Sequence, residues 1–162
     1  MPKERLAIAA ASLVLPACAT VPPVGVAIES ISYEAGPCFG ACPIYAVTVH
    51  ADGSGLFEGG RFAAVQGQRA FRVTPEQYRA FAALLEPLRP QSGAVRYSGP
   101  PLCEEMATDQ ASADVKWRMR DGGEQELYFY YGCDMVGKKA MAERLRRAPD
   151  LLPIALFIRA GP

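Results

Sequence analysis

The sequence has a single histidine, no excess of charge of either sign and no hydrophobic run long enough to cross a membrane. Lysine plus arginine and aspartate plus glutamate each total 17 in 162 residues, so the formal net charge is zero. Proteins that bind nucleic acid through its phosphates carry a basic surplus. Nucleic acid is therefore not an expected partner. The length indicates one domain with one hydrophobic core.

The short motifs of common catalytic sites are also missing. The sequence contains no Gly-x-Ser-x-Gly turn, phosphate-binding loop, dinucleotide fingerprint or His-Glu-x-x-His pair. Its only histidine, His50, closes a strand-like segment, where a solvated surface side chain is the plain interpretation. We assign no catalytic residue, expect no cofactor and no metal, and favour a protein that is not an enzyme.

The start of the chain has the three-part pattern of an export signal. Residues 1–17 combine a basic start, an apolar run over residues 6–15 and small residues before Cys18. This run is shorter than the about 20 apolar residues that a membrane-spanning helix needs. Leu15-Pro16-Ala17-Cys18 resembles a bacterial lipobox, whose cysteine receives a diacylglycerol. We therefore expect removal of residues 1–17 and lipidation at Cys18, which anchors the protein to a membrane.

Two other fates of this segment remain open. Ala17-Cys18-Ala19 also fits the pattern for ordinary signal cleavage, which releases a secreted or soluble periplasmic product, and the segment can also be a structural helix. Lipidation leaves an even four of the five cysteines for pairing. Because no aspartate follows Cys18, a host with two membranes would place the protein at the periplasmic face of the outer membrane. Residues 18–27, with two prolines, are expected to form a short tether.

Residues 28–160 are predicted to form one domain of the α+β class. Thr74 and Gln77 have the spacing of a capping box that starts a helix before Pro87, and Asp52-Gly53 indicates a hairpin turn. Strands are predicted at 27–33, 44–50, 55–58, 61–65, 69–73, 113–120 and 125–131, and further helices at 138–147 and 151–158. Antiparallel hairpins in a sheet, with two or three helices packed on one face, satisfy this pattern.

Four cysteines lie within the predicted domain and allow three pairings. We favour Cys38–Cys42, close together in a Gly- and Pro-containing loop, and Cys103–Cys133, which would join the two outer ends of one hairpin. Structural cross-links are the plain interpretation of both pairs in an oxidising compartment. A redox role for Cys38 and Cys42 and a metal site that includes His50 remain alternatives.

Three sequence blocks carry a family resemblance. Ile31-Ser32-Tyr33-Glu34, Gly36-Pro37-Cys38-Phe39-Gly40-Ala41-Cys42-Pro43 and Tyr45 with Val47 resemble the opening of the DUF6438 domain of bacterial proteins, a domain of unknown function. The likeness spans residues 28–145, including Asp52-Gly53 and the Gly122 hairpin. Glu124-Gln125-Glu126 stands where the family pattern has a basic residue. Cys103 and Cys133 are additions to that pattern, which favours their pairing with each other. The resemblance implies no activity.

A few polar and aromatic residues are candidates for a binding surface. Thr108 and Asp109 follow the exposed pair Glu104-Glu105, and Asp109 is the first choice for a polar site that faces the Cys38 loop. The aromatic run 128–131 is expected to be mainly packing, with an exposed remainder that could contact an envelope protein or a glycan. We expect an exported cell-envelope lipoprotein that acts as a non-catalytic binding or structural module, with a thiol-disulfide or redox-sensing protein as the alternative.

Overall fold

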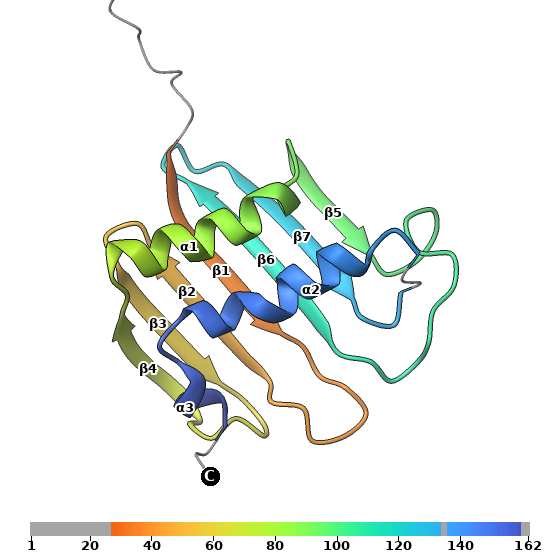
Figure 1. Cartoon of the computed structure of the whole chain (residues 1–162), viewed down its shortest axis with the longest axis horizontal. Coiled ribbons are helices and arrows are strands. Elements are labelled where there is room, and N and C mark those ends of the chain that lie inside the picture. Colours follow the sequence, from red (N-terminus) through yellow and green to blue (C-terminus); the bar gives the residue numbers. More distant parts are fainter. Residues whose placement is uncertain (1–26, 134–135, 160–162) are drawn as a thin grey trace, which may run out of the picture.

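The computed structural model describes residues 27–133 and 136–159, in which seven strands form one sheet that helices cover on one face (Figure 1). The strands are β1 (Ile28–Ala35), β2 (Tyr45–His50), β3 (Ser54–Gly59), β4 (Gly67–Arg72), β5 (Gly93–Tyr97), β6 (Ser112–Met119) and β7 (Glu124–Tyr130). The helices are α1 (Pro75–Leu85), α2 (Lys139–Arg147) and α3 (Ala155–Ile158), with 3₁₀ turns η1 (Glu86–Leu88) and η2 (Ala148–Leu151). The predicted signal, Cys18 and most of the tether lie outside the described residues. In the described part, no helix is both long and apolar enough to cross a membrane.

The strand order is β4-β3-β2-β1-β6-β7-β5, and this arrangement confirms the α+β prediction. Neighbouring strands are antiparallel except β5, which pairs in parallel with β7. β5 was not among the predicted strands. It is a five-residue edge strand that forms only because α1 and η1 carry the chain back across the sheet, and no local pattern encodes that pairing.

The alternation of core-facing and outward-facing residues breaks at the start of β1, where its pairing with β6 is also irregular. Ile31 and Tyr33 face the core and Ser32 faces away, but Ile28 falls out of this alternation. The pairing of β1 with β6 shifts register between Ile28 and Ser30. A β-bulge adds one residue to one strand and so reverses the phase of what precedes it. The broken alternation therefore marks the bulge.

The β2–β3 hairpin forms at the predicted turn. Of Asp52 and Gly53, only Gly53 has a positive φ, 82°. The Asp52 carboxylate accepts hydrogen bonds from the backbone amide and the hydroxyl of Ser54, at 2.8 and 2.6 Å. The aspartate side chain therefore holds the turn through these bonds. The Asp-Gly pair suggested a tight turn with two positive φ angles, and the observed turn has only one.

Two predicted elements are wrong. Residues 61–65 form no strand; instead the backbone amides of Ala64 and Val65 donate to the carbonyls of Ile158 and Phe157. The last helix is a single turn, Ala155–Ile158, because a proline at position 153 interrupts the apolar run. The run still contributes to the core through two buried side chains before that turn, but Leu156 is 70% exposed.

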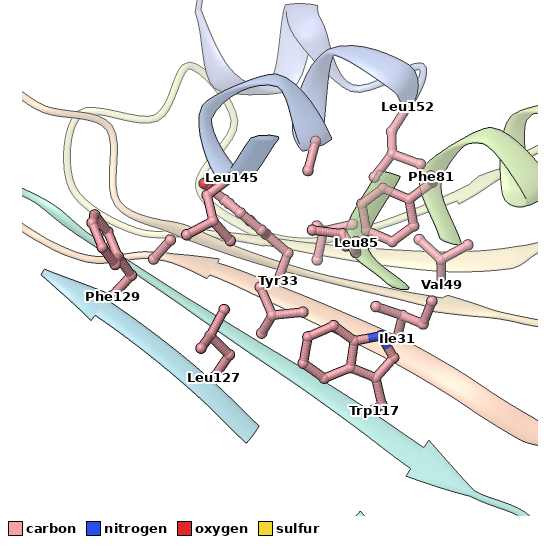
Figure 2. Close-up of a cluster of buried hydrophobic side chains, with 14 of the residues drawn as sticks. Ile31, Tyr33, Val49, Phe81, Leu85, Trp117, Leu127, Phe129, Leu145 and Leu152 are labelled. Carbon is pink, nitrogen blue, oxygen red and sulfur yellow. The ribbon is translucent and has the colours of Figure 1, made fainter. Parts of the chain in front are cut away.

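The core lies between the sheet and α1, α2 and η2 (Figure 2). The capping box predicted at Thr74 and Gln77 is formed, and it directs Phe81 and Leu85 of α1 onto the sheet. The fully buried side chains are Trp117, Phe57, Phe81, Phe129, Ile31, Leu85, Leu127, Leu145, Ile154, Val47, Val49 and Val115. Members of five strands and both longer helices meet in this one cluster.

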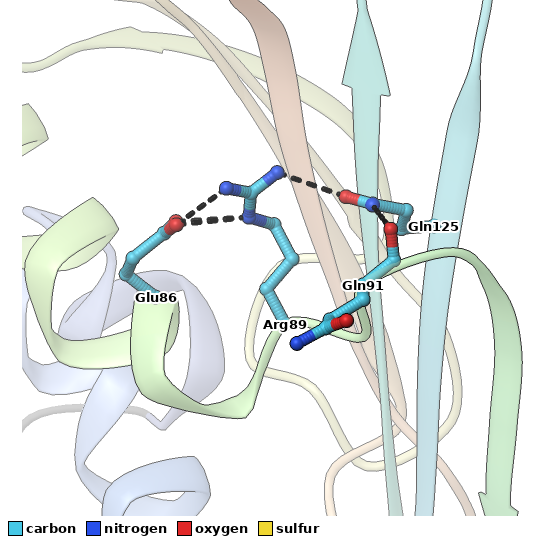
Figure 3. Close-up of polar contacts among 4 residues, drawn as sticks. All are labelled: Glu86, Arg89, Gln91 and Gln125. Carbon is cyan, nitrogen blue, oxygen red and sulfur yellow. Dashed lines mark hydrogen bonds and ion pairs between the residues drawn. The ribbon is translucent and has the colours of Figure 1, made fainter. Parts of the chain in front are cut away.

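A polar cluster joins the end of the α1 region to β7 (Figure 3). The Arg89 guanidinium donates to the Glu86 carboxylate and to the side-chain oxygen of Gln125, the latter at 2.9 Å. The Gln125 amide in turn donates to the Gln91 carbonyl at 2.8 Å. These bonds fix the chain where it leaves the helix layer and enters β5.

The sheet face that carries no helix is polar and contains one perturbed carboxyl group. Partial burial, with Glu126 and Glu34 nearby, raises the pKa of Asp114 to about 6, and Lys116 and Arg96 offset part of this effect. One Asp114 carboxylate oxygen is shielded from solvent and has no hydrogen-bond partner among the described residues. The ionised Asp114 carboxylate therefore lowers the free energy of unfolding.

Candidate functional site

A groove of about 710 Å³ opens at the end of the sheet where β1 ends and β2 begins. One wall is the loop that contains Cys38 and Cys42, and the opposite wall is the end of α2 with η2 and α3. The residues that line it are Tyr33, Ala35, Gly36, Cys38, Phe39, Cys42, Pro43, Tyr45, Asp109, Gln110, Ala111, Ser112, Tyr131, Arg146, Pro149, Asp150, Ala155, Ile158 and Arg159. Residues far apart in the sequence therefore share one concave surface.

The Cys38 wall is a short loop closed by a disulfide. Cys38 and Cys42 are paired, with their Cα atoms 5.8 Å apart. Gly36 lets this loop start close to β6, because a Cβ there would collide with the Ser112 hydroxyl. Phe39 lies between the two cysteines and is 87% exposed. The cross-linked loop thus holds an aromatic side chain out at the rim of the groove.

The loop before β6 supplies Asp109, and β7 holds this loop in place. The Phe39 amide donates to the Asp109 carbonyl at 3.1 Å, so the structure brings Asp109 to the Cys38 loop. The Thr108 hydroxyl donates to the Asp109 carboxylate at 3.0 Å. The Tyr130 hydroxyl accepts from the Gln110 amide and donates to the Ala107 carbonyl. The sequence indicated Thr108 and Asp109 but not the two hydrogen bonds by which Tyr130 holds their loop.

Three tyrosines, from β1, β2 and the turn after β7, line the floor of the groove. Tyr33 of β1 is 3% exposed and extends toward Leu145 of α2 (Figure 2), and its ring stacks near Tyr45 of β2 at 6.3 Å. Burial raises the pKa of Tyr33 well above its ordinary value, and Tyr131 and Tyr45 raise it further. Burial also raises the pKa values of Tyr45 and Tyr131. All three phenols are therefore neutral hydrogen-bonding groups over the physiological range.

Charged side chains surround these phenols in balanced number. The Arg146 guanidinium lies over the Tyr131 ring, 4.4 Å from its centroid. Arg146 lowers the pKa of Tyr131, whereas at Tyr45 a raising effect of Asp150 opposes a lowering effect of Arg159. No described residue forms an ion pair with either arginine. The groove therefore offers a polar or charged group donors that no described residue uses.

The second disulfide is buried beside the groove. Cys103 and Cys133 are paired, with Cα atoms 5.4 Å apart and exposures of 0 and 1%. A smaller hollow lined by Met106 and Gly132 adjoins this region and shares Gln110 and Tyr131 with the groove. Both favoured pairings are thus formed, and one lies at the surface while the other lies in the core.

His50 does not join the cysteines. It is at the far end of β2 from the groove, about 17 Å from Tyr45 at about 3.3 Å per residue. Within the described ranges, no group of three or more His, Cys, Asp or Glu side chains is arranged to hold a metal ion.

The residues that sequence reasoning missed are Tyr33, Tyr45 and Arg146. On the sequence, Tyr33 and Tyr45 fit the core-facing side of predicted strands. Arg146 fits the C-terminal end of a predicted helix, where a basic side chain is ordinary. Tyr131 was named only as part of an aromatic run. The one usable signal was a tyrosine on the core face within three residues of a strand end, where its hydroxyl can reach a surface.

Comparison with known proteins supports the resemblance found in the sequence. The model of the family described as "Domain of unknown function (DUF6438)" matches residues 29–151, which include β1 from its second residue, the other six strands, α1, α2 and most of the groove. A search of curated proteins gives no match. Because the family match covers well over half of the sequence, the chain belongs to the DUF6438 family.

Proposed function

We propose that this protein is an exported, lipid-anchored module of the cell envelope that binds a ligand or partner in the groove beside the Cys38–Cys42 loop. One observation carries the binding function: three phenols, two arginines that no described residue pairs and a highly exposed Phe39 converge on a single hollow of about 710 Å³. Ligand sites are typically concave, with apolar and aromatic walls and a few convergent polar groups.

The fold separates the groove from the proposed anchor. The tether after Cys18 would join the domain at Ile28, the first residue of β1, and the first residue of that strand to line the groove is Tyr33. Five residues along a strand span about 17 Å. A ligand could therefore occupy the groove while the lipid of Cys18 remains in the membrane.

Photo-crosslinking tests the binding function. A photoreactive phenylalanine analogue replaces Phe39 at the groove rim, and in a matched strain it replaces Leu56, an exposed apolar residue on the sheet face without helices. Irradiation of intact cells is expected to give a discrete adduct from position 39 and not from position 56. Equal adduct formation at both positions, or none at position 39, would overturn the groove as the binding surface.

Replacement of Cys18 tests the anchor separately. Cys18→Ser removes the thiol that would be lipidated, so the variant is expected to lose membrane association and to retain its signal segment. Membrane fractionation and the intact mass of the purified chain report both outcomes. Normal processing with continued membrane association would contradict lipidation at this residue.

A redox role is the second candidate, because the two disulfides differ in access. Cys38 and Cys42 line the groove, whereas Cys103 and Cys133 are buried. A protein dithiol in the envelope could attack one sulfur of Cys38–Cys42 through a mixed disulfide, and its second thiolate would then release the reduced pair while the donor is oxidised. The reduction potential decides this case: a value below about −300 mV identifies a structural disulfide.

A further inference from the structure

The corner of the groove under the end of α2 contains an arginine, Arg146, whose hydrogen-bonding edge meets no acceptor among the described residues. The face of the Arg146 guanidinium contacts the Tyr131 ring at 4.4 Å. No residue in the described part of the chain forms a hydrogen bond or ion pair with Arg146. A cation–π contact uses the face of the guanidinium and leaves its planar set of N–H donors for an acceptor. Residues 27–133 and 136–159 do not provide that acceptor.

Two phenols converge on the same corner. Tyr33 is 3% exposed, and Arg146 acts on the pKa of both Tyr33 and Tyr131. The Tyr131 hydroxyl is shielded from solvent and has the Tyr33 hydroxyl as its hydrogen-bonding neighbour. Tyr131 therefore serves this corner through its ring, which holds the Arg146 guanidinium, and Tyr33 lines the groove beside it. The group that Arg146 can bind would have to come from outside the described residues.

The balance of charge favours a ligand group with one negative charge. Arg146 and Arg159 bring two positive charges to the groove, and Asp109 and Asp150 bring two negative charges. A doubly charged phosphate would be repelled by both aspartates, whereas a carboxylate carries one charge. The two oxygens of a carboxylate also match the paired N–H donors of a guanidinium.

We propose that the corner formed by Arg146, Tyr33 and Tyr131 binds a carboxylate group of the ligand. The guanidinium edge of Arg146 donates to the carboxylate oxygens, and the Tyr131 ring holds the guanidinium in place. This inference rests on the proposed binding function and specifies its chemistry. The carboxylate can belong to a peptide C-terminus or to an acidic sugar, since both present the same group.

Two matched ligand pairs separate these sources. Isothermal titration calorimetry on the purified full chain compares N-acetyl-alanyl-alanine with its C-terminal amide, and glucuronic acid with glucose. The acid member of one pair is expected to bind about tenfold or more tightly than its neutral partner, because a hydrogen bond to a charged group is worth that much. The pair that shows the difference identifies the source.

Neighbouring residues on α2 provide a matched control. Arg146→Gln is expected to abolish the preference for the acid, whereas Arg147→Gln, an exposed arginine outside the groove, is expected to keep it. Arg146→Lys retains the charge without the planar donor edge and should restore the preference only in part. Tyr131→Leu removes the ring against which the guanidinium lies and should weaken binding of the acid several-fold.

The outcomes distinguish this subsite from the groove function. Equal binding of acid and neutral forms, no measurable binding of either pair, or equal effects of Arg146→Gln and Arg147→Gln would each overturn the carboxylate subsite. The adduct from position 39 does not depend on these ligands, so the groove function can stand when the subsite fails.

Discussion

The two disulfides should contribute unequally to stability, and the difference follows from the lengths of the loops they close. Cys103–Cys133 spans a sequence separation of 30 residues and Cys38–Cys42 one of 4. In the chain-entropy model the longer loop contributes about 3.6 kcal/mol and the shorter about 1.9 kcal/mol. Paired alanine substitutions at Cys103 and Cys133 should therefore lower the free energy of unfolding by about twice as much as those at Cys38 and Cys42.

Burial sharpens this contrast. The sulfur atoms of Cys103 and Cys133 are enclosed, so their loss also leaves small cavities, whereas the other pair lies at the groove surface. Urea unfolding of the purified full chain without reductant measures both variants. Fluorescence of Trp117, the single tryptophan and fully buried, reports the transition. Equal losses for the two variants, or a loss below about 1 kcal/mol at Cys103 and Cys133, would refute the loop-closure reasoning.

Three further substitutions test other parts of the fold. Because the pKa of Asp114 is raised in the folded state, the folded protein binds a proton more tightly than the unfolded chain, and stability falls as pH rises from about 4 through about 6. Asp114→Asn should therefore stabilise the protein at pH 8 by about 1 kcal/mol, a value reduced because the carboxyl group is partly exposed. At pH 3 the same substitution should give no gain. Glu104→Gln, on an exposed loop, serves as the control. Thr74→Ala should cost about 1 kcal/mol in urea unfolding, because it removes one half of the capping box. Gly132→Ala should cost about 1–3 kcal/mol, because its Cβ would meet the Ala107 carbonyl, whereas Gly99→Ala, with open space around it, should be neutral in thermal unfolding.

The sequence predicted those strands and helices that short-range patterns determine, such as alternation along a strand or a capping box at a helix start. The alternation over 113–119 became β6, with Val115 and Trp117 in the core, and the Thr74 capping box formed as expected. The apolar run after Asp150 was misassigned because hydrophobicity alone does not fix a helix. In that run Leu152 and Ile154 are buried as an irregular segment on either side of a proline.

Long-range pairing was beyond those signals, and the groove depends on it. Tyr33 and Tyr131 are 98 positions apart and meet because β1, β6 and β7 are consecutive in the sheet. On the sequence, a tyrosine that follows the core alternation cannot be distinguished from packing, because only the three-dimensional register shows that it lines a hollow. Arg146 at a helix end has an equally ordinary interpretation. The site therefore emerges only once the strand order is known.

Most residues of the loop from Gly36 to Pro43 have a structural reason to be there, and one does not. Gly36 is explained by its close approach to Ser112, Gly40 by a positive φ of 142°, and the cysteines by their cross-link. Phe39 has no such structural reason: its ring is 87% exposed and only its backbone amide is bonded, to Asp109. An aromatic ring kept in water by a cross-linked loop gains no folding free energy there. Its place at the rim is therefore the feature that crosslinking from position 39 puts to the test.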